Sequence, residues 1–208
     1  MSMGAGALKY LESLYPDLDA RGQWACVGNA KTAQKSIMLG VLYGRQVRHR
    51  RGPRNWQAVW DNVFAPRPDD VLWFTFVRNP FDYVVSAFHF LQQRGEIASQ
   101  WGFQAYVHEV LGVEGPSVNR HFREQHLTCT FEGESVPGMF VGRFEHLQRD
   151  WAYIAGRIGA QHVLPHRNQS THKRYTEYYD DESRKVVEKL YRLDLELLGY
   201  TFDGESGR

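Results

Sequence analysis

Two mainly apolar runs, residues 24–27 (WACV) and 71–77 (VLWFTFV), stand out from the otherwise mixed polar and apolar pattern of the chain. The second run is rich in β-branched and aromatic residues, and Thr75 is its single polar residue. Continuous apolar runs of this length are typical of strands that are covered on both faces of a sheet. The pattern therefore predicts two buried, central strands.

A helical pattern follows each of these strands. After the second strand, Asn79 is placed as an N-cap, Pro80 as the first helical residue and Asp82 in the first turn. The apolar residues at helical spacing are Ile37, Met38, Val41 and Leu42 in the first helix, which Gly44 can end, and Val84, Phe88 and Leu91 in the second.

The rest of the chain continues to alternate. The pattern predicts a helix over residues 103–111, strands over 127–131 and 139–141 around the turn GESVPG, and two later amphipathic helices, the last ending at Gly199. These features predict an α/β fold, with a central, mostly parallel sheet flanked by helices in a P-loop-like three-layer arrangement. The apolar stripes of the two later helices are Leu147, Trp151, Ile154 and Ile158, and Val186, Leu190, Leu193 and Leu197.

Composition indicates one globular domain over residues 1–208, with an N-terminal extension (1–22) and a disordered tail (203–208). Hydrophobic residues make up 42%, and no segment has the length of a membrane span or the pattern of a secretion signal. We expect Cys26 and Cys129 to be buried free thiols, which favours a cytoplasmic location. A net charge of +1 argues against a protein that coats polyanions, although five arginines lie within residues 45–54, either in a solvated loop or to attract an anion.

Both strand-to-helix connections carry a cation. Lys31 lies in the first, Arg78 follows the second strand directly, and Ser86 adds a hydroxyl on the helix that follows. In parallel sheets, ligands bind beyond the carboxyl ends of the strands, where helix N-termini favour anions. The spacing suggests one ligand with phosphates at two separate points.

A nucleotide triphosphatase or kinase of the P-loop class is the first alternative. Its loop needs a glycine directly before Lys-Ser/Thr, but Gln34 precedes Lys35 and Ser36, and Gly28 is one position out of register. Magnesium requires an acidic residue at a neighbouring strand end. The two strand ends carry Arg78 and Arg143 instead. We therefore expect direct anion binding without a metal.

Four segments in order resemble the PAPS-dependent sulfotransferases, where PAPS is 3′-phosphoadenosine 5′-phosphosulfate. They are AKTAQKSI, FVRNPFDYVVSAF, VGRFEHLQRDW and LPHRNQSTHKRYTEYYDDES, which together extend the resemblance over about residues 25–202. The likeness is to the carbohydrate 2-O and 4-O enzymes and their small bacterial relatives. The chain departs from the family pattern at Ala30, Gln34, Lys35 and Tyr83.

The resemblance implies a PAPS donor, a hydroxyl acceptor (carbohydrate or small molecule) and no metal. It places Lys31 beside the bridging oxygen as a catalytic cation and assigns Arg78 to the 3′-phosphate, although Arg78 could instead pair with Asp82. Ser170 and Lys173 either close over the nucleotide or belong to an ordinary polar loop. The donor-binding residues implied are Lys31, Thr32, Ala33, Gln34, Lys35, Ser36, Arg78, Ser86, Ser170 and Lys173.

The acceptor hydroxyl must lose a proton, which requires a base within hydrogen-bond distance. His49, between the two phosphate loops, is the first candidate, His121 the second and Glu145 a further one. A nonenzymatic module that binds RNA or an acidic glycan through the arginine-rich segment is the remaining alternative. We expect no nucleic acid or membrane partner, and the sequence does not identify the acceptor or the oligomeric state.

Overall fold

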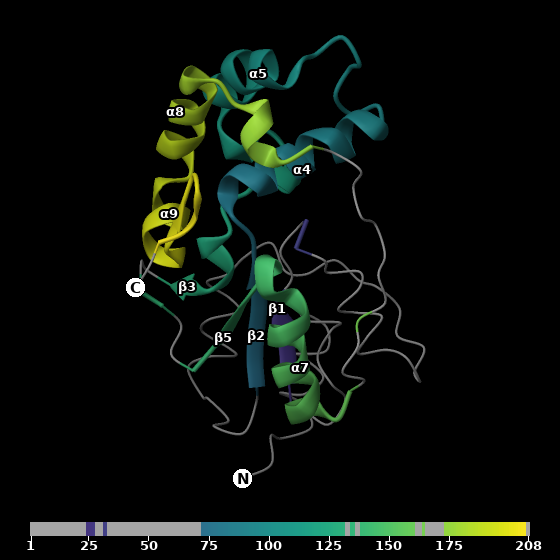
Figure 1. Cartoon of the computed structure of the whole chain (residues 1–208), viewed down its shortest axis with the longest axis vertical. Coiled ribbons are helices and arrows are strands. Elements are labelled where there is room, and N and C mark those ends of the chain that lie inside the picture. Colours follow the sequence, from purple (N-terminus) through teal and green to yellow (C-terminus); the bar gives the residue numbers. More distant parts are fainter. Residues whose placement is uncertain are drawn as a thin grey trace, which may run out of the picture.

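A computed structural model of the chain describes residues 24–27, 31–32, 72–131, 134–135, 138–160, 164 and 173–206 (Figure 1). Short 3₁₀ helices connect several of its elements. The helices are α4 Pro80–Gln93, α5 Phe103–Tyr106, α6 Gly112–Glu114, α7 Leu147–Ile158, α8 Asp181–Leu190 and α9 Arg192–Leu198, and the strands are β1 Trp24–Val27, β2 Leu72–Val77, β3 Thr130–Phe131, β4 Glu134–Ser135, β5 Phe140–Arg143, β6 Tyr200–Thr201 and β7 Gly204–Glu205.

The main sheet consists of three parallel strands in the order β1-β2-β5. Both predicted apolar runs are strands, and β2 lies between the other two, with every residue from Trp73 to Val77 buried. The mixed α/β fold with a parallel sheet is thus confirmed. Because the three strands are parallel, their carboxyl ends lie at one edge of the sheet, which is also where α4 begins (Figure 1).

Helix α4 begins as the sequence predicts. The Asn79 side chain accepts a hydrogen bond from the Phe81 amide at 3.0 Å, Pro80 is the first helical residue, and Asp82 lies in the first turn. The side-chain cap satisfies an amide that has no partner within the helix. The direction in which the chain leaves β2 is therefore well defined.

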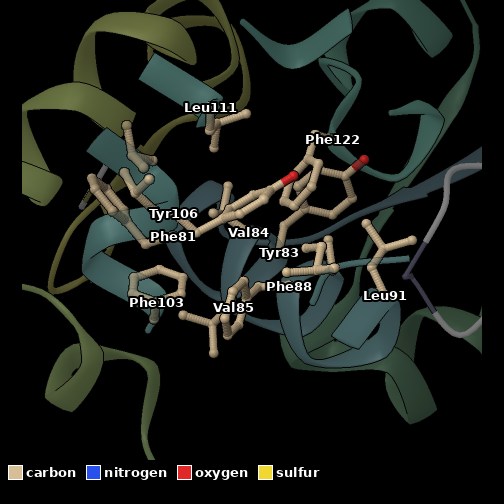
Figure 2. Packing of buried hydrophobic residues seen from close by; sticks show 14 of the residues in the cluster. Phe81, Tyr83, Val84, Val85, Phe88, Leu91, Phe103, Tyr106, Leu111 and Phe122 are labelled. Carbon is tan, nitrogen blue, oxygen red and sulfur yellow. The ribbon is translucent and has the colours of Figure 1, made fainter. Parts of the chain in front are cut away.

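Two apolar clusters hold the sheet and helices together. Helix α7 covers one face of the sheet, where Trp151 and Ile154 pack fully buried with Phe74 and Phe76 (Figure 1). Full burial of such side chains stabilises the fold by about 1.5–3 kcal/mol each. The larger cluster surrounds α4 (Figure 2). It includes Phe81, Val84, Phe88, Leu91, Phe103, Tyr106, Leu111, Phe122, Val187 and Tyr191.

The predicted helix over residues 103–111 is present but extends to residue 114 and has a π-helical middle, Val107–Leu111. The predicted strand over 127–131 is shorter, because main-chain hydrogen bonds from Thr128 and Cys129 form a 3₁₀ turn first, and the Thr128 and Thr130 hydroxyls also donate to main-chain carbonyls there. The later strand, β5, does not pair with it. It joins the parallel sheet beside β2 instead.

The last helix is divided. It breaks at Tyr191 into α8 and α9. Of the predicted stripe, Val186 and Leu190 are partly buried against the core, whereas Leu193 is 43% exposed. Asp194 accepts hydrogen bonds from the main-chain amides of residues 125 and 126, and the Tyr191 hydroxyl donates to the Phe122 oxygen. These bonds allow both polar side chains to be buried on the inner face of the two helices. The buried residues of the two helices and the residue between them are Ser183, Val187, Tyr191, Asp194 and Leu198.

Residues 203–206, which the sequence assigns to a disordered tail, continue in the structure as the hairpin of β6 and β7. The predicted helix over residues 37–42 and the N-terminal extension lie outside the described residues. Cys129 is a buried free thiol, as predicted, and burial raises its pKa to about 12. Every helix in the described ranges is too short or too polar to span a lipid bilayer.

Candidate active site at the carboxyl edge of the sheet

Lys31 and Arg78 meet beyond the carboxyl ends of β1 and β2. The Arg78 Nη1 group donates a hydrogen bond to the Lys31 main-chain oxygen at 3.3 Å, although the residues are 47 positions apart in sequence. Arg78 is 6% exposed, and its guanidinium lies 4.2 Å from the centre of the Phe144 ring. The structure therefore brings together the two cations predicted at the strand ends.

Arg78 also forms an ion pair with Asp82, which was its alternative predicted role. Its Nε donates to Asp82 Oδ2 at 2.7 Å, one turn into α4. A buried guanidinium requires an anion nearby, and Asp82 supplies one. The ion pair engages Nε, while no hydrogen bond within the described part of the chain involves Nη2. The pair therefore orients the guanidinium.

One face of α4 faces the Lys31 loop. Residues four apart lie on the same side of a helix, so Asp82, Ser86 and Phe90 form a row that continues from Arg78. Lys31 contacts both ends of this row, because its main-chain oxygen accepts from Arg78 and its Nζ lies 4.0 Å from the centre of the Phe90 ring. Ser86, 5% exposed, lies between these contacts.

Lys31 has an unusual backbone. Its φ of 59° lies in the left-handed region, where few residues other than glycine are found. Such conformations cost about 1–3 kcal/mol and are concentrated at functional sites. The following residue, Thr32, is 1% exposed. The loop therefore holds Lys31 in a conformation that its own side chain disfavours.

His121 lies against the same aromatic ring as Lys31. It lies in the 3₁₀ helix Arg120–Phe122, and its imidazole is 4.9 Å from the Phe90 ring between centres. Burial lowers the pKa of His121, and the positive charges of Arg120 and Lys31 lower it further, to about 4. His121 is therefore neutral at physiological pH. Its Nδ1 is buried and has no hydrogen-bond partner among the described residues.

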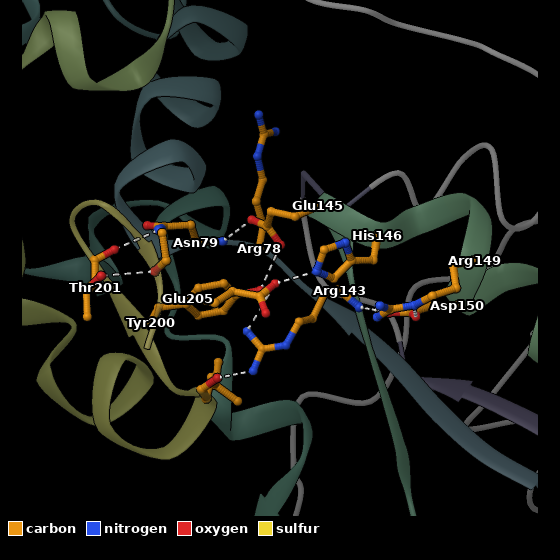
Figure 3. A network of polar contacts seen from close by, with 12 residues as sticks. Arg78, Asn79, Arg143, Glu145, His146, Arg149, Asp150, Tyr200, Thr201 and Glu205 are labelled. Atoms are coloured by element: carbon orange, nitrogen blue, oxygen red, sulfur yellow. Dashed lines mark hydrogen bonds and ion pairs between the residues drawn. The ribbon is translucent and has the colours of Figure 1, made fainter. Parts of the chain in front are cut away.

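Glu145 and Arg143 belong to a network on the C-terminal hairpin (Figure 3). The two carboxylate oxygens of Glu145 accept hydrogen bonds from the main-chain amide of Asn79 at 2.7 Å and from the Tyr200 hydroxyl at 2.8 Å. Arg143, predicted with Arg78 as an anion-binding residue, donates to the Leu198 oxygen and lies over the Tyr200 ring. In this structure Arg143 thus holds the end of α9.

Lys173 lies just before the 3₁₀ helix Tyr175–Tyr178. It lines a cavity of about 410 Å³ beside α5, with Phe103, Glu177 and Tyr178 among its neighbours, and neither Lys31 nor Arg78 lines this cavity. Several predicted site residues, including the first candidate base, lie outside the described residues. They are Ala33, Gln34, Lys35, Ser36, His49 and Ser170.

Sequence reasoning missed Phe90, the residue on which Lys31 and His121 meet. A signal was present, because Phe90 continues the four-residue spacing from Arg78 through Asp82 and Ser86. Within the described residues, no three His, Cys, Asp or Glu side chains are grouped so as to hold a metal ion.

A family model described as "Sulfotransferase family" matches residues 48–201, and the chain therefore belongs to the sulfotransferase family. Among solved structures, a sulfotransferase from Alicyclobacillus acidocaldarius is 15% identical, with 93% of each chain covered and a TM-score of 0.32. An identity and a TM-score this low support no conclusion about this chain. A search of curated proteins finds no significant match.

Proposed function

We propose that this protein transfers a sulfuryl group from PAPS to a hydroxyl of a carbohydrate or small-molecule acceptor, without a metal ion. The observation that carries the proposal is the contact between Arg78 and Lys31 at the carboxyl edge of a parallel sheet, in a chain of the sulfotransferase family. With this function we also propose the P-loop-like three-layer form of the fold. The coarser assignment, a transferase of this family, rests on the family match alone.

The described cations fit a donor with phosphates at two points. Arg78 has a guanidinium suited to planar recognition of phosphate, and Lys31 supplies a second charge on the adjoining loop. We assign Arg78 and Ser86 to the 3′-phosphate, and Lys31 and Thr32 to the 5′ side. The remaining residues assigned to the donor are Ala33, Gln34, Lys35, Ser36, Ser170 and Lys173.

When bound, PAPS supplies a sulfuryl group whose bond to a 5′-phosphate oxygen breaks as a bond to the acceptor oxygen forms. Lys31 acts as the cation that stabilises negative charge on the departing phosphate, an interaction stronger in the transition state than in the ground state. The left-handed backbone of Lys31 and its contact with Phe90 support this role, because both limit the positions that the ammonium can adopt.

His121 is the described candidate for the base that removes the acceptor proton. A base must be neutral to accept a proton, and burial together with nearby positive charge lowers the pKa of His121 to about 4. Its place on the Phe90 ring beside Lys31 supports an acceptor site there. His49 remains the alternative base.

Calorimetry with adenosine 3′,5′-bisphosphate, the nucleotide left after transfer, tests the function directly. We expect binding that is indifferent to EDTA and much tighter than binding of ATP, because ATP has no 3′-phosphate for Arg78. ATP binding that requires magnesium would instead support a kinase. Salt-sensitive RNA or glycan binding that persists in Lys31→Ala would support the polyanion module. A screen with ³⁵S-labelled PAPS then identifies the acceptor.

A further inference from the structure

The backbone of Arg78 is held by a single side chain from a distant segment. The Arg78 amide donates to Gln125 Oε1 at 2.8 Å, and Gln125 Nε2 donates back to the Arg78 carbonyl oxygen at 2.7 Å. The registers of β2 with its two neighbours end at Thr75 and Val77, so Arg78 lies just beyond the ladder. The amide of Gln125 therefore takes the place of a neighbouring strand for this residue.

Gln125 is itself firmly anchored. It is 0% exposed, and its main-chain amide donates to Asp194 Oδ2 at 2.8 Å. Asp194, also 0% exposed, accepts from the amide of His126 at 2.8 Å and is 2.6 Å from His126 Nδ1. A buried carboxylate is tolerated when its oxygens are hydrogen-bonded in this way. Helix α9 thereby fixes Gln125 against the end of β2.

The residue after Arg78 is held separately. Glu145 accepts a hydrogen bond from the main-chain amide of Asn79, and the Asn79 side chain donates one to the Thr201 carbonyl oxygen at 2.8 Å (Figure 3). In Figure 3 the Arg78 side chain extends away from this network, while Asn79 forms the hydrogen bonds to it. Two successive main-chain amides at this turn are thus bound by side chains from separate segments.

The geometry points to Gln125 as a positioning residue for anion binding by Arg78, with Glu145 supporting the same turn. This inference rests on the proposed function for the identity of the anion. A guanidinium on a fixed backbone has fewer orientations to lose when it binds a phosphate, and preorganisation of this kind increases affinity. If the turn were released, Arg78 would keep its ion pair with Asp82, but the backbone from which its side chain extends would no longer be fixed.

The test uses Gln125→Met, which keeps the unbranched shape and removes both hydrogen bonds. Gln92→Met is the matched control, because Gln92 makes one hydrogen bond to the Trp101 oxygen at the far end of α4. We expect Gln125→Met to weaken binding of adenosine 3′,5′-bisphosphate by about tenfold or more, and the control to bind as the wild type does. In an Arg78→Ala background, the further substitution Gln125→Met should have no effect.

Equal weakening by Gln125→Met in both backgrounds would overturn the inference, because a general loss of structure does not depend on Arg78. Unchanged binding would also overturn it. If Gln125→Met does not fold, the bisphosphate affinities of Glu145→Ala and Glu145→Gln are compared instead. Glu145 is exposed, so its substitution disturbs the core less. We expect Glu145→Ala to weaken binding and Glu145→Gln to retain it, because glutamine can still accept the Asn79 amide. Equal affinities would contradict the positioning role.

Hydrogen exchange of the Arg78 amide separates this inference from the proposed function. If the wild type binds no bisphosphate nucleotide, the proposed function fails, and exchange still reports on the turn. Faster exchange at Arg78 in Gln125→Met than in Gln92→Met supports the positioning of the turn by Gln125. Equal exchange in the two variants overturns it.

Discussion

The guanidinium of Arg78 donates a hydrogen bond to the main-chain oxygen of Lys31 at 3.3 Å. Each residue follows one of two adjacent parallel strands, so the contact depends on strand pairing and on the conformations of both connections. It places the two residues at the same edge of the sheet. In a member of the sulfotransferase family, this is where we propose that the donor binds.

Lys31→Ala should greatly reduce turnover. Removing a group that stabilises transition-state charge costs about 100- to 1,000-fold in kcat. Steady-state assays with PAPS and an identified acceptor measure the effect, with Lys185→Ala, an exposed position on α8, as the control. Near-normal turnover in Lys31→Ala would remove this lysine from the mechanism.

Arg78→Ala should weaken binding of adenosine 3′,5′-bisphosphate. A hydrogen bond to a charged group contributes about 1.5–3 kcal/mol, so we expect a loss of about tenfold or more. Calorimetry gives the dissociation constant, and Arg157→Ala, at an exposed position on α7, provides a matched arginine control. An unchanged constant would mean that Arg78 acts only through its contacts within the protein, such as those with Asp82 and Lys31.

The pH profile of kcat/KM identifies the base. The base must be neutral, so activity is present above its pKa and is lost as pH falls through it. Because the pKa of His121 is lowered to about 4, we expect kcat/KM to fall only near that pH. Loss of activity near the usual histidine value of about 6.5 would indicate another group, such as His49.

His121→Gln provides the matching mutational test. Loss of a general base reduces turnover by about 100- to 10,000-fold. Binding of the bisphosphate nucleotide should be unchanged, since we assign His121 to the acceptor and not to the donor. Wild-type turnover in this variant would favour His49 or Glu145 as the base.

Gly142→Ala should destabilise the fold. A Cβ at Gly142, within β5, would lie 2.6 Å from an atom of the Phe76 ring, and that ring is almost fully buried. Overpacking of a core costs about 1–3 kcal/mol. Urea denaturation measures the change, with Val141→Ala at the exposed neighbouring position as the control. An unchanged midpoint would show that the Phe76 ring moves without cost.

The local features of the chain could be predicted from the sequence. Apolar runs identified β1 and β2, and the order Asn79, Pro80, Asp82 located the start of α4, because strand burial and helix capping depend on residues that are near one another in the chain. The same local logic placed Lys31 and Arg78 at strand ends. It also identified Asp82 as a possible partner of Arg78, and the structure shows that pair.

Features that depend on distant contacts were decided only by the tertiary structure. Asp194 is buried because it accepts hydrogen bonds from residues 125 and 126, so the buried face of the last helix is displaced from the predicted stripe, of which Leu193 is exposed while Val186 and Leu190 pack against the core. Phe90 joins Lys31 to His121, and Gln125 replaces a strand neighbour for Arg78, across separations that no local pattern encodes. Local propensity therefore determined the elements and the charges at their ends, while long-range hydrogen bonding and packing decided which of them meet.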